Sequence, residues 1–155
     1  MASDEYGTPQ ALFDVLDLEF DFEWDAAASA VNHKCPHYWT QENSALDRPG
    51  GWEPLRYFCN PPYSKPNIPS FIEAAIEASQ NGALVVMLLP CDTGTVWYQD
   101  LVETYAMEVR KLRGRIRFEG ATQGAKFATL AVIFAPHVTA GVGPREWCWD
   151  WKAEV

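Results

Sequence analysis

The sequence predicts an α/β fold with a mostly parallel sheet, because apolar extended segments alternate with helical ones along 155 residues. Residues 83–90 (ALVVMLLP) are entirely apolar, which is typical of a strand buried on both faces of a parallel sheet. Residues 70–82 (SFIEAAIEASQNG) instead repeat apolar side chains at helical spacing and close with Asn81-Gly82, a common helix end. We expect a single domain over residues 1–155.

Residues 8–20 (TPQALFDVLDLEF) are predicted to form the first helix. Four apolar side chains recur along it at helical spacing: Leu12, Phe13, Leu16 and Phe20. Thr8 is the expected N-cap, and Pro9 takes the first helical position, where its missing N–H costs no hydrogen bond.

A short strand is expected after this helix. Residues 20–24 (FDFEW) alternate apolar and acidic side chains, and the strand that they predict ends at Asp25. The small residues of segment 25–32 (DAAASAVN) are typical of a helix that packs closely on the strand before it. Residues 34–52 are irregular, with a second strand expected before Glu42.

The remainder of the chain continues the alternation of strands and helices. The predicted elements, in addition to those at 70–82 and 83–90, are a strand at 55–59 (LRYFC), a helix at 95–106 (TVWYQDLVETYA), strand pieces at 108–112 and 115–118, and a final strand at 127–136 (FATLAVIFAP).

Charge is unevenly distributed along the chain. The net charge of −9 argues against nucleic acid as a partner, and residues 1–47 hold ten acids against Lys34 alone. Residues 110–117 (RKLRGRIR) hold five bases and no acid, so the chain repels a polyanion on one face and attracts it on another. We expect these five bases to bind phosphates, with a solvated hairpin as the alternative: Arg110, Lys111, Arg113, Arg115 and Arg117.

The sequence gives no sign of export or of a membrane span. No apolar run approaches the roughly 20 residues that a span needs, and residues 1–10 lack a basic stretch followed by an apolar one. Four cysteines are widely spaced, without a C-x-x-C pair: Cys35, Cys59, Cys91 and Cys148. We expect reduced thiols, a cytoplasmic location and, by default, a monomer. His33-x-Cys35-x-His37 has no fourth ligand at a fitting spacing, so no metal is expected.

Residues 56–63 (RYFCNPPY) run from a strand directly into a proline pair. Proline lacks an N–H and fixes φ, so Pro61 and Pro62 end the strand and leave Asn60 and Tyr63 on a stiff turn. Asn-Pro is also ordinary turn chemistry. Ligands bind beyond the carboxyl ends of strands in parallel sheets, so the positions of Asn60 and Asp25 favour a functional site.

Three ordered motifs resemble those of the phage-type DNA N6-adenine methyltransferases: Thr8-Pro9-x-x-Leu12-Phe13, Asp25-Ala26-Ala27-Ala28 and Asn60-Pro61-Pro62-Tyr63. The resemblance covers about residues 7–136 and leaves 137–155 as a C-terminal extension. It implies a Rossmann-like methyltransferase sandwich with a C-terminal antiparallel strand. It also implies S-adenosylmethionine as cofactor and double-stranded DNA as substrate, methylated at adenine N6 by a phage or prophage enzyme in a bacterial host cell.

The resemblance implies a catalytic role for residues 60–63. Adenine's exocyclic nitrogen is a poor nucleophile, because its lone pair is delocalised into the ring. The Asn60 side-chain oxygen and the Pro61 carbonyl are expected to accept its hydrogens. The Pro61-Pro62 pair is expected to fix their aim, and Tyr63 to stack on a base flipped out of the duplex.

The resemblance also implies a cofactor site around Thr8, Pro9, Asp25 and Ala26. Thr8 and Pro9 are expected near the methionine portion, and Asp25 corresponds to the acid that opens the pocket. Alanines follow Asp25 where many methyltransferases carry glycines, which departs from the family pattern. Glu42 is the candidate for the ribose hydroxyls, with a solvated loop acid as the alternative.

The sequence leaves two other functions open. The same turn suits an amide nitrogen, so a protein-glutamine N-methyltransferase is one alternative, although residues 8–13 (TPQALF) favour the DNA enzymes. A non-catalytic DNA- or cofactor-binding module is the other, because of the acidic charge and the alanine-rich loop. Residues 147–151 (WCWDW) are expected to fold onto the body of the protein rather than stack on bases.

Overall fold

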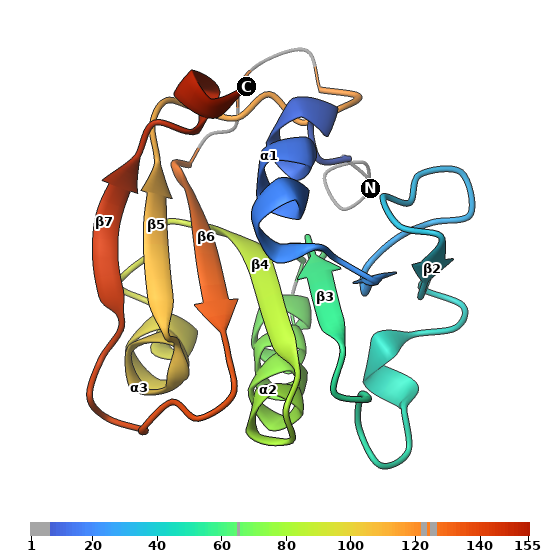
Figure 1. Ribbon diagram of the computed structural model, residues 1–155, viewed down its shortest axis with the longest axis vertical. Helices are drawn as coiled ribbons and strands as arrows, with labels where there is room; N and C mark the ends of the chain where they lie inside the picture. Colours follow the sequence, from blue (N-terminus) through green and yellow to red (C-terminus); the bar gives the residue numbers. More distant parts are fainter. Residues whose placement is uncertain (1–6, 65, 122–123, 125–126) are drawn as a thin grey trace.

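The computed structural model describes residues 7–64, 66–121, 124 and 127–155. Within these residues the fold centres on one sheet with strand order β2-β1-β3-β4-β6-β5-β7 (Figure 1). The strands are β1 (Trp24–Asp25), β2 (His37–Tyr38), β3 (Arg56–Cys59), β4 (Leu84–Pro90), β5 (Glu108–Leu112), β6 (Thr129–Phe134) and β7 (Arg145–Trp149). The helices are α1 (Gln10–Phe20), α2 (Asn67–Gln80) and α3 (Glu103–Tyr105), with a π-helical segment η3 (Trp97–Val102) and 3-10 turns η2 (Ala45–Asp47) and η4 (Trp151–Glu154).

Strand direction brings most carboxyl ends to one edge of the sheet. β2, β1, β3 and β4 are parallel to their neighbours. β6 is antiparallel to both β4 and β5, so β5 and its parallel neighbour β7 run in the same direction as β4. The prediction of a mostly parallel sheet with an antiparallel strand late in the chain is therefore confirmed. The loops after β1, β3, β4 and β5 all leave from the same edge, here named the carboxyl edge.

Helices cover both faces of the sheet. α1 lies on one face, and α2 and α3 lie on the other (Figure 1). Because side chains alternate along a strand, Phe58 packs edge-on against Phe13 of α1, with ring centroids 5.1 Å apart. Its neighbours Tyr57 and Cys59 belong to the core on the α2 side. In β4 the residues from 85 to 90 are buried, which explains the continuous apolar run.

Two of the predicted elements do not form, and the strand predicted at 20–24 is limited to Trp24–Asp25 because α1 continues to Phe20. Segment 26–32 forms bends rather than a helix, because the Asp25 carboxylate accepts the N–H groups of Ala27 and Lys34 and the chain wraps around it. Residues 115–118 form no strand, and this segment leads instead to an isolated antiparallel bridge between Gly7 and Glu119.

The C-terminal third holds one strand that the sequence did not predict. The predicted final strand appears as β6, and β7 then adds to the sheet alongside β5. Trp149 and Trp151 are buried, so the expectation that the tryptophan-rich tail folds onto the body is confirmed. In the part of the chain that is described, every helix is too short or too polar to cross a membrane.

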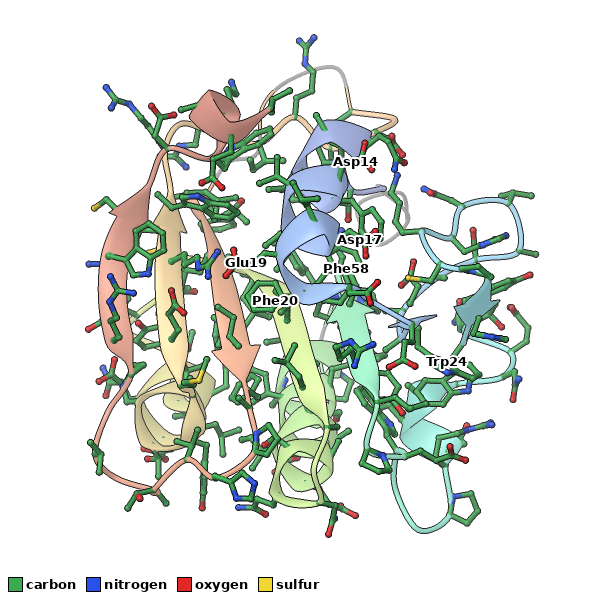
Figure 2. The ribbon with its side chains drawn as sticks, in the orientation of Figure 1. Asp14, Asp17, Glu19, Phe20, Trp24 and Phe58 are labelled. Carbon is green, nitrogen blue, oxygen red and sulfur yellow. The ribbon has the colours of Figure 1, made fainter. Side chains whose placement is uncertain are left out.

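Arg110 holds α1 and β7 to the sheet. Its guanidinium donates to both oxygens of Glu19, at 2.8 and 2.5 Å, and to Glu108 at 2.9 Å. Three aromatic rings lie within 5.3 Å of it: Phe20, Trp147 and Trp149. Figure 2 shows Glu19 and Phe20 projecting from the end of α1 over the neighbouring strands. Arg110 is only 4% exposed, so its guanidinium is paired inside the fold rather than in solvent.

Replacing Arg110 with Met is expected to lower the free energy of unfolding by roughly 3–5 kcal/mol, because the buried Glu108 carboxylate then loses its cation. Urea unfolding followed by far-UV circular dichroism measures the change. Arg113→Met is the matched control, since Arg113 is exposed, and we expect it to shift stability by less than about 0.5 kcal/mol. Equal stability of the two variants would contradict a stabilising role for Arg110.

Candidate active site

Asn60 leaves the sheet at the carboxyl end of β3, in the turn with Pro61, Pro62 and Tyr63. Its side-chain Nδ2 donates to Thr8 Oγ1 at 3.1 Å. Thr8 is 3% exposed and Asn60 is half-buried, so this hydrogen bond is partly buried. Since the nitrogen end of the amide is held by Thr8, the oxygen Oδ1 is left to act as an acceptor.

Tyr63 stands half-buried at the end of the same turn. Its hydroxyl donates to the Leu88 carbonyl of β4 at 3.5 Å, and its ring meets Phe118 edge-on, with centroids 6.5 Å apart. Burial raises the pKa of the Tyr63 phenol above its ordinary value, so the ring is neutral at physiological pH. The side chain therefore forms a neutral, apolar wall next to Asn60.

Asp25 lies beside this turn, because β1 pairs with β3 and Asp25 is opposite Phe58. Its carboxylate is 3% exposed and accepts the N–H of Ala27 at 3.2 Å and of Lys34 at 2.9 Å. Burial raises the pKa of the Asp25 carboxyl above its ordinary value, while these two hydrogen bonds oppose the rise. The acid thus organises the loop that follows β1.

The alanines after Asp25 are tied to the sheet through their backbone. The N–H of Ala26 donates to the Phe58 carbonyl at 2.8 Å, and that of Ala28 donates to the Trp39 carbonyl at 2.9 Å. The loop therefore takes its shape from backbone bonds rather than from glycine flexibility.

Glu42 sits farther out at the same edge. It follows β2 and is exposed in the turn that Thr40 and Asn43 close through a backbone hydrogen bond of 3.2 Å. Because β2, β1 and β3 are neighbours, Glu42, Asp25 and Asn60 follow three adjacent parallel strands at the carboxyl edge. The structure buries Asp25 and leaves Glu42 in solvent.

The segment around Thr8 joins parts of the chain that are distant in sequence. Pro9, not Thr8, occupies the N-cap position of α1, so the prediction of Thr8 as the N-cap is wrong. Gly7 and Glu119 exchange two backbone hydrogen bonds, of 3.2 and 2.7 Å. Lys34 adds an ion pair to Glu119 at 3.3 Å. Sequence analysis missed Gly7, Lys34 and Glu119, because partners 85 or more residues apart leave no local pattern.

The predicted phosphate-binding residues do not form one group. Arg110 is buried between Glu19 and Glu108, so it is not available to phosphates, which corrects the expectation for that residue. Lys111 is exposed on the opposite face of β5. Three exposed arginines follow the end of β5 at the carboxyl edge: Arg113, Arg115 and Arg117.

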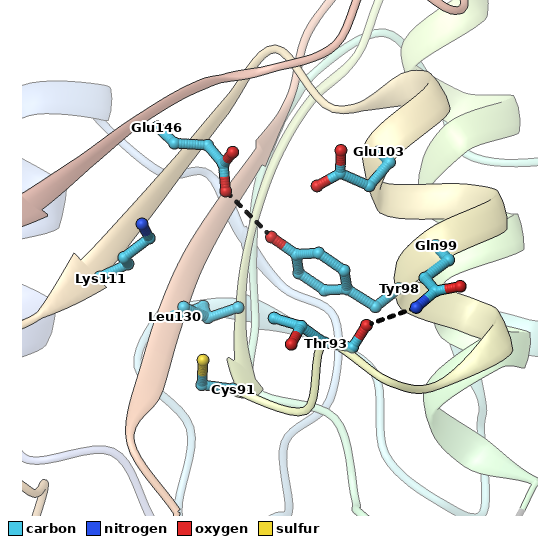
Figure 3. Close-up of a pocket in the computed structure, with 8 residues that line it drawn as sticks. All are labelled: Cys91, Thr93, Tyr98, Gln99, Glu103, Lys111, Leu130 and Glu146. Carbon is cyan, nitrogen blue, oxygen red and sulfur yellow. Dashed lines mark hydrogen bonds between the residues drawn. The ribbon is translucent and has the colours of Figure 1, made fainter.

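Lys111 borders a cavity of about 360 Å³ on the α3 side of the sheet (Figure 3). The other residues that line this cavity are Cys91, Thr93, Tyr98, Gln99, Glu103, Leu130 and Glu146. The Tyr98 hydroxyl donates to Glu146 at 3.2 Å across it. None of the predicted catalytic or cofactor residues lines this cavity, so it is separate from the Asn60 turn.

The His33-x-Cys35-x-His37 motif is occupied by local contacts. His33 Nδ1 lies 2.9 Å from the Cys35 carbonyl, and the His33 ring stacks on Tyr38 with centroids 3.9 Å apart. His37 stacks on Trp24 instead. Across the described residues, no three His, Cys, Asp or Glu side chains converge as metal ligands.

The sheet order defines a Rossmann-like α/β protein, with the candidate site in the polar turn at the carboxyl edge. The family model described as DNA N-6-adenine-methyltransferase (Dam) matches residues 1–139, and the chain belongs to this family. Strand β7 lies beyond the matched residues. Membership of a methyltransferase family implies that a methyl donor takes part.

Relatives with the same description come from bacteriophages. The DNA N-6-adenine-methyltransferase of Escherichia phage T1 is 35% identical over 98 residues, which cover 63% of this chain and 40% of the relative. The DNA N-6-adenine-methyltransferase of Haemophilus phage HP1 is 29% identical over 146 residues, covering 89% of this chain and 82% of the relative. The match to the T1 protein thus spans less than half of its length. A solved structure of a methyltransferase candidate from Thermoplasma acidophilum has a TM-score of 0.46 and 11% identity, and covers 92% of this chain and 69% of its own.

The raised pKa of Asp25 predicts a specific pH dependence of stability. The folded protein retains this proton to a higher pH than the unfolded chain does, so folding binds protons just above the ordinary value of 3.8. We therefore expect the stability of the wild type relative to Asp25→Asn to fall as pH rises through this window and then level off. Urea unfolding of both proteins from about pH 4 to about pH 8 measures the difference. A difference that grows with pH would show that the two amide hydrogen bonds outweigh burial.

Proposed function

We propose that this chain transfers a methyl group from S-adenosylmethionine to N6 of adenine in double-stranded DNA. The enzyme is encoded by a phage or prophage and acts in the cytoplasm of the bacterial host. One observation carries the proposal: in a chain of the Dam family, the turn 60–63 sits at the carboxyl end of β3, beside the buried Asp25 of β1.

Asn60 and Pro61 act on the target amino group. When bound, S-adenosylmethionine supplies an electrophilic methyl group on a sulfonium. Asn60 Oδ1 and the Pro61 carbonyl accept the two hydrogens of adenine N6 and so favour the tetrahedral nitrogen, whose lone pair forms the new N–C bond. The cofactor would keep the electron pair of its S–C bond, and the surplus proton of the amino group would leave to solvent. Asn60 needs no negative charge, because the electrophile is already cationic.

Pro62 and Tyr63 position the base. The proline pair fixes the turn, so the two acceptors keep their aim without reorganising during the reaction. Tyr63 offers a neutral ring on which a base flipped out of the duplex stacks. Its contact with Phe118 supports the ring from the loop that follows β5.

The residues at the carboxyl edge fit the chemistry of the cofactor. The backbone of Thr8 and Pro9 would face the methionine portion, because the Thr8 hydroxyl is bonded to Asn60. Asp25 and Ala26 would shape the pocket after β1, and Glu42 would reach the ribose hydroxyls. This fit rests on the polar groups at the edge: Asp25 and Glu42 lie at the ends of β1 and β2, next to Asn60 after β3. Two carboxylates suit a ligand that carries hydroxyl groups and a positive charge.

DNA contacts are assigned to the bases that remain exposed in the run 110–117. Arg113, Arg115 and Arg117 follow β5 at the edge that carries Asn60, and Lys111 is exposed on β5 itself. Three of these bases, Arg113, Arg115 and Arg117, therefore concentrate positive charge at the edge that carries Asn60.

The direct test is incubation of the purified protein with radiolabelled S-adenosylmethionine and unmethylated duplex DNA, followed by digestion and separation of the nucleosides. We expect label in N6-methyladenine. Asn60→Ala should lose about 10²–10³-fold in turnover, because it removes an acceptor needed as the nitrogen becomes tetrahedral. Asn81→Ala, at the end of α2, is the matched control and should retain wild-type turnover.

The same incubation separates the alternatives. Label in a glutamine-containing protein substrate but not in DNA would identify a protein-glutamine N-methyltransferase. Cofactor or DNA binding without transfer to either substrate would identify a binding module. Near-wild-type turnover in Asn60→Ala would remove the catalytic assignment of this turn.

The DNA surface is tested by salt dependence. If Arg115 and Arg117 contact phosphates, replacing both with Gln should weaken binding at every sequence and reduce the slope of log K against log salt by up to about 0.9 per contact. Arg56→Gln/Arg145→Gln is the matched control, because both arginines are exposed at the amino ends of their strands, opposite the carboxyl edge. Fluorescence anisotropy on one labelled duplex measures both slopes. Equal slopes in the two double variants would place the phosphate contacts elsewhere.

A further inference from the structure

Thr8 is buried next to Asn60, and its hydroxyl has a use other than capping a helix. The α1 N-cap position belongs to Pro9, and no side chain caps that end by a hydrogen bond. Thr8 Oγ1 instead accepts the hydrogen bond from Asn60 Nδ2, across 52 residues of sequence. Thr8 is 3% exposed and Asn60 is half-buried, so the acceptor of this bond is shielded from water and the bond is partly buried.

We infer that Thr8 is a positioning residue that holds the Asn60 amide by its nitrogen end, with Oδ1 left for the substrate. An asparagine amide has one acceptor end and one donor end, and rotation by half a turn exchanges them. A donor end turned towards adenine N6 would meet the hydrogens of the amino group and could not accept them. The bond to Thr8 holds the nitrogen end and leaves Oδ1 for the substrate.

The backbone around Thr8 allows it little movement. The N–H of Gly7 donates to the Glu119 carbonyl, and the Gly7 carbonyl accepts the N–H of Glu119. A Cβ added at Gly7 would lie 2.1 Å from Asn32 Nδ2 and 2.7 Å from Glu119 Oε1, so the segment is enclosed by two other parts of the chain. On the other side, the Pro9 carbonyl accepts the N–H groups of Leu12 and Phe13 in the first turn of α1. Thr8 is thus fixed between a bridge and a helix.

This inference rests on the proposed catalytic role of Asn60, and it differs from a cofactor contact of Thr8. A cofactor contact predicts weaker binding of S-adenosylmethionine when the hydroxyl is removed. A positioning role predicts slower turnover with the cofactor affinity preserved, because the hydroxyl then acts only through Asn60.

The test compares Thr8→Val, which keeps the shape and removes the acceptor, with Thr8→Ser, which keeps the acceptor. We expect Thr8→Val to lower kcat on DNA by about tenfold with little change in KM for S-adenosylmethionine, and Thr8→Ser to restore most of the rate. In an Asn60→Ala background, Thr8→Val should cause no further loss, since the residue through which it acts is absent. A raised KM with unchanged kcat, or losses that multiply in the double variant, would overturn the inference.

A second measurement does not depend on activity. In the ligand-free protein, the side-chain amide of Asn60 gives two proton signals in a ¹⁵N-correlated spectrum, and Asn60→Ala assigns them. We expect one of these protons to be shifted downfield and slow to exchange with water in the wild type and in Thr8→Ser, and to lose both properties in Thr8→Val. Unchanged signals in Thr8→Val would overturn the inference. A wild type that shows the protected proton but methylates no DNA would refute the proposed function while upholding the orientation of Asn60 by Thr8.

Discussion

The buried carboxylate of Asp25 is the constraint on which the carboxyl edge depends. It accepts the N–H groups of Ala27 and Lys34, and so turns the chain after β1 into a compact loop. The loop places Lys34, whose ammonium pairs with Glu119 and donates to Gln10 at 2.9 Å. Glu119 in turn bridges to Gly7, the residue before Thr8. Asp25 is thus linked to Asn60 by successive contacts that pass through Lys34, Glu119 and the Gly7–Thr8 segment.

The parts of the fold that local sequence determines were predictable, and the parts that depend on distant partners were not. Strand β4 and helix α2 follow from an apolar run and a helical period, which are properties of neighbouring residues. The turn at Asn60 was found because proline acts on the backbone directly. Thr8 fitted a local capping pattern, but its hydroxyl bonds to Asn60, 52 residues away. The helix predicted over 25–32 does not form, because the chain bends around Asp25, whose carboxylate also accepts the N–H of Lys34 beyond that segment.

The basic run shows why charge along a sequence does not give charge on a surface. Consecutive residues of a strand face opposite sides of the sheet, so Arg110 turns to α1 while Lys111 turns to the cavity beside α3. Arg110 is neutralised by Glu19, 91 residues earlier, and Glu108. These two ion pairs give Arg110 a structural role instead of a role in phosphate binding. What remains exposed is concentrated after β5, at the edge that holds the site.

The C-terminal strand also bears on the site, although it lies beyond the residues that the family model matches. Trp147 and Trp149 of β7 pack against the Arg110 guanidinium, and Arg110 forms an ion pair with Glu19 near the end of α1. The opposite end of α1 begins directly after Thr8 and Pro9. A helix behaves as a rigid rod over its 11 residues, so fixing its last turn restricts the movement of its first. Strand β7 therefore contributes to the rigidity of the Thr8–Asn60 contact from the far end of the helix, without a residue of its own at the site.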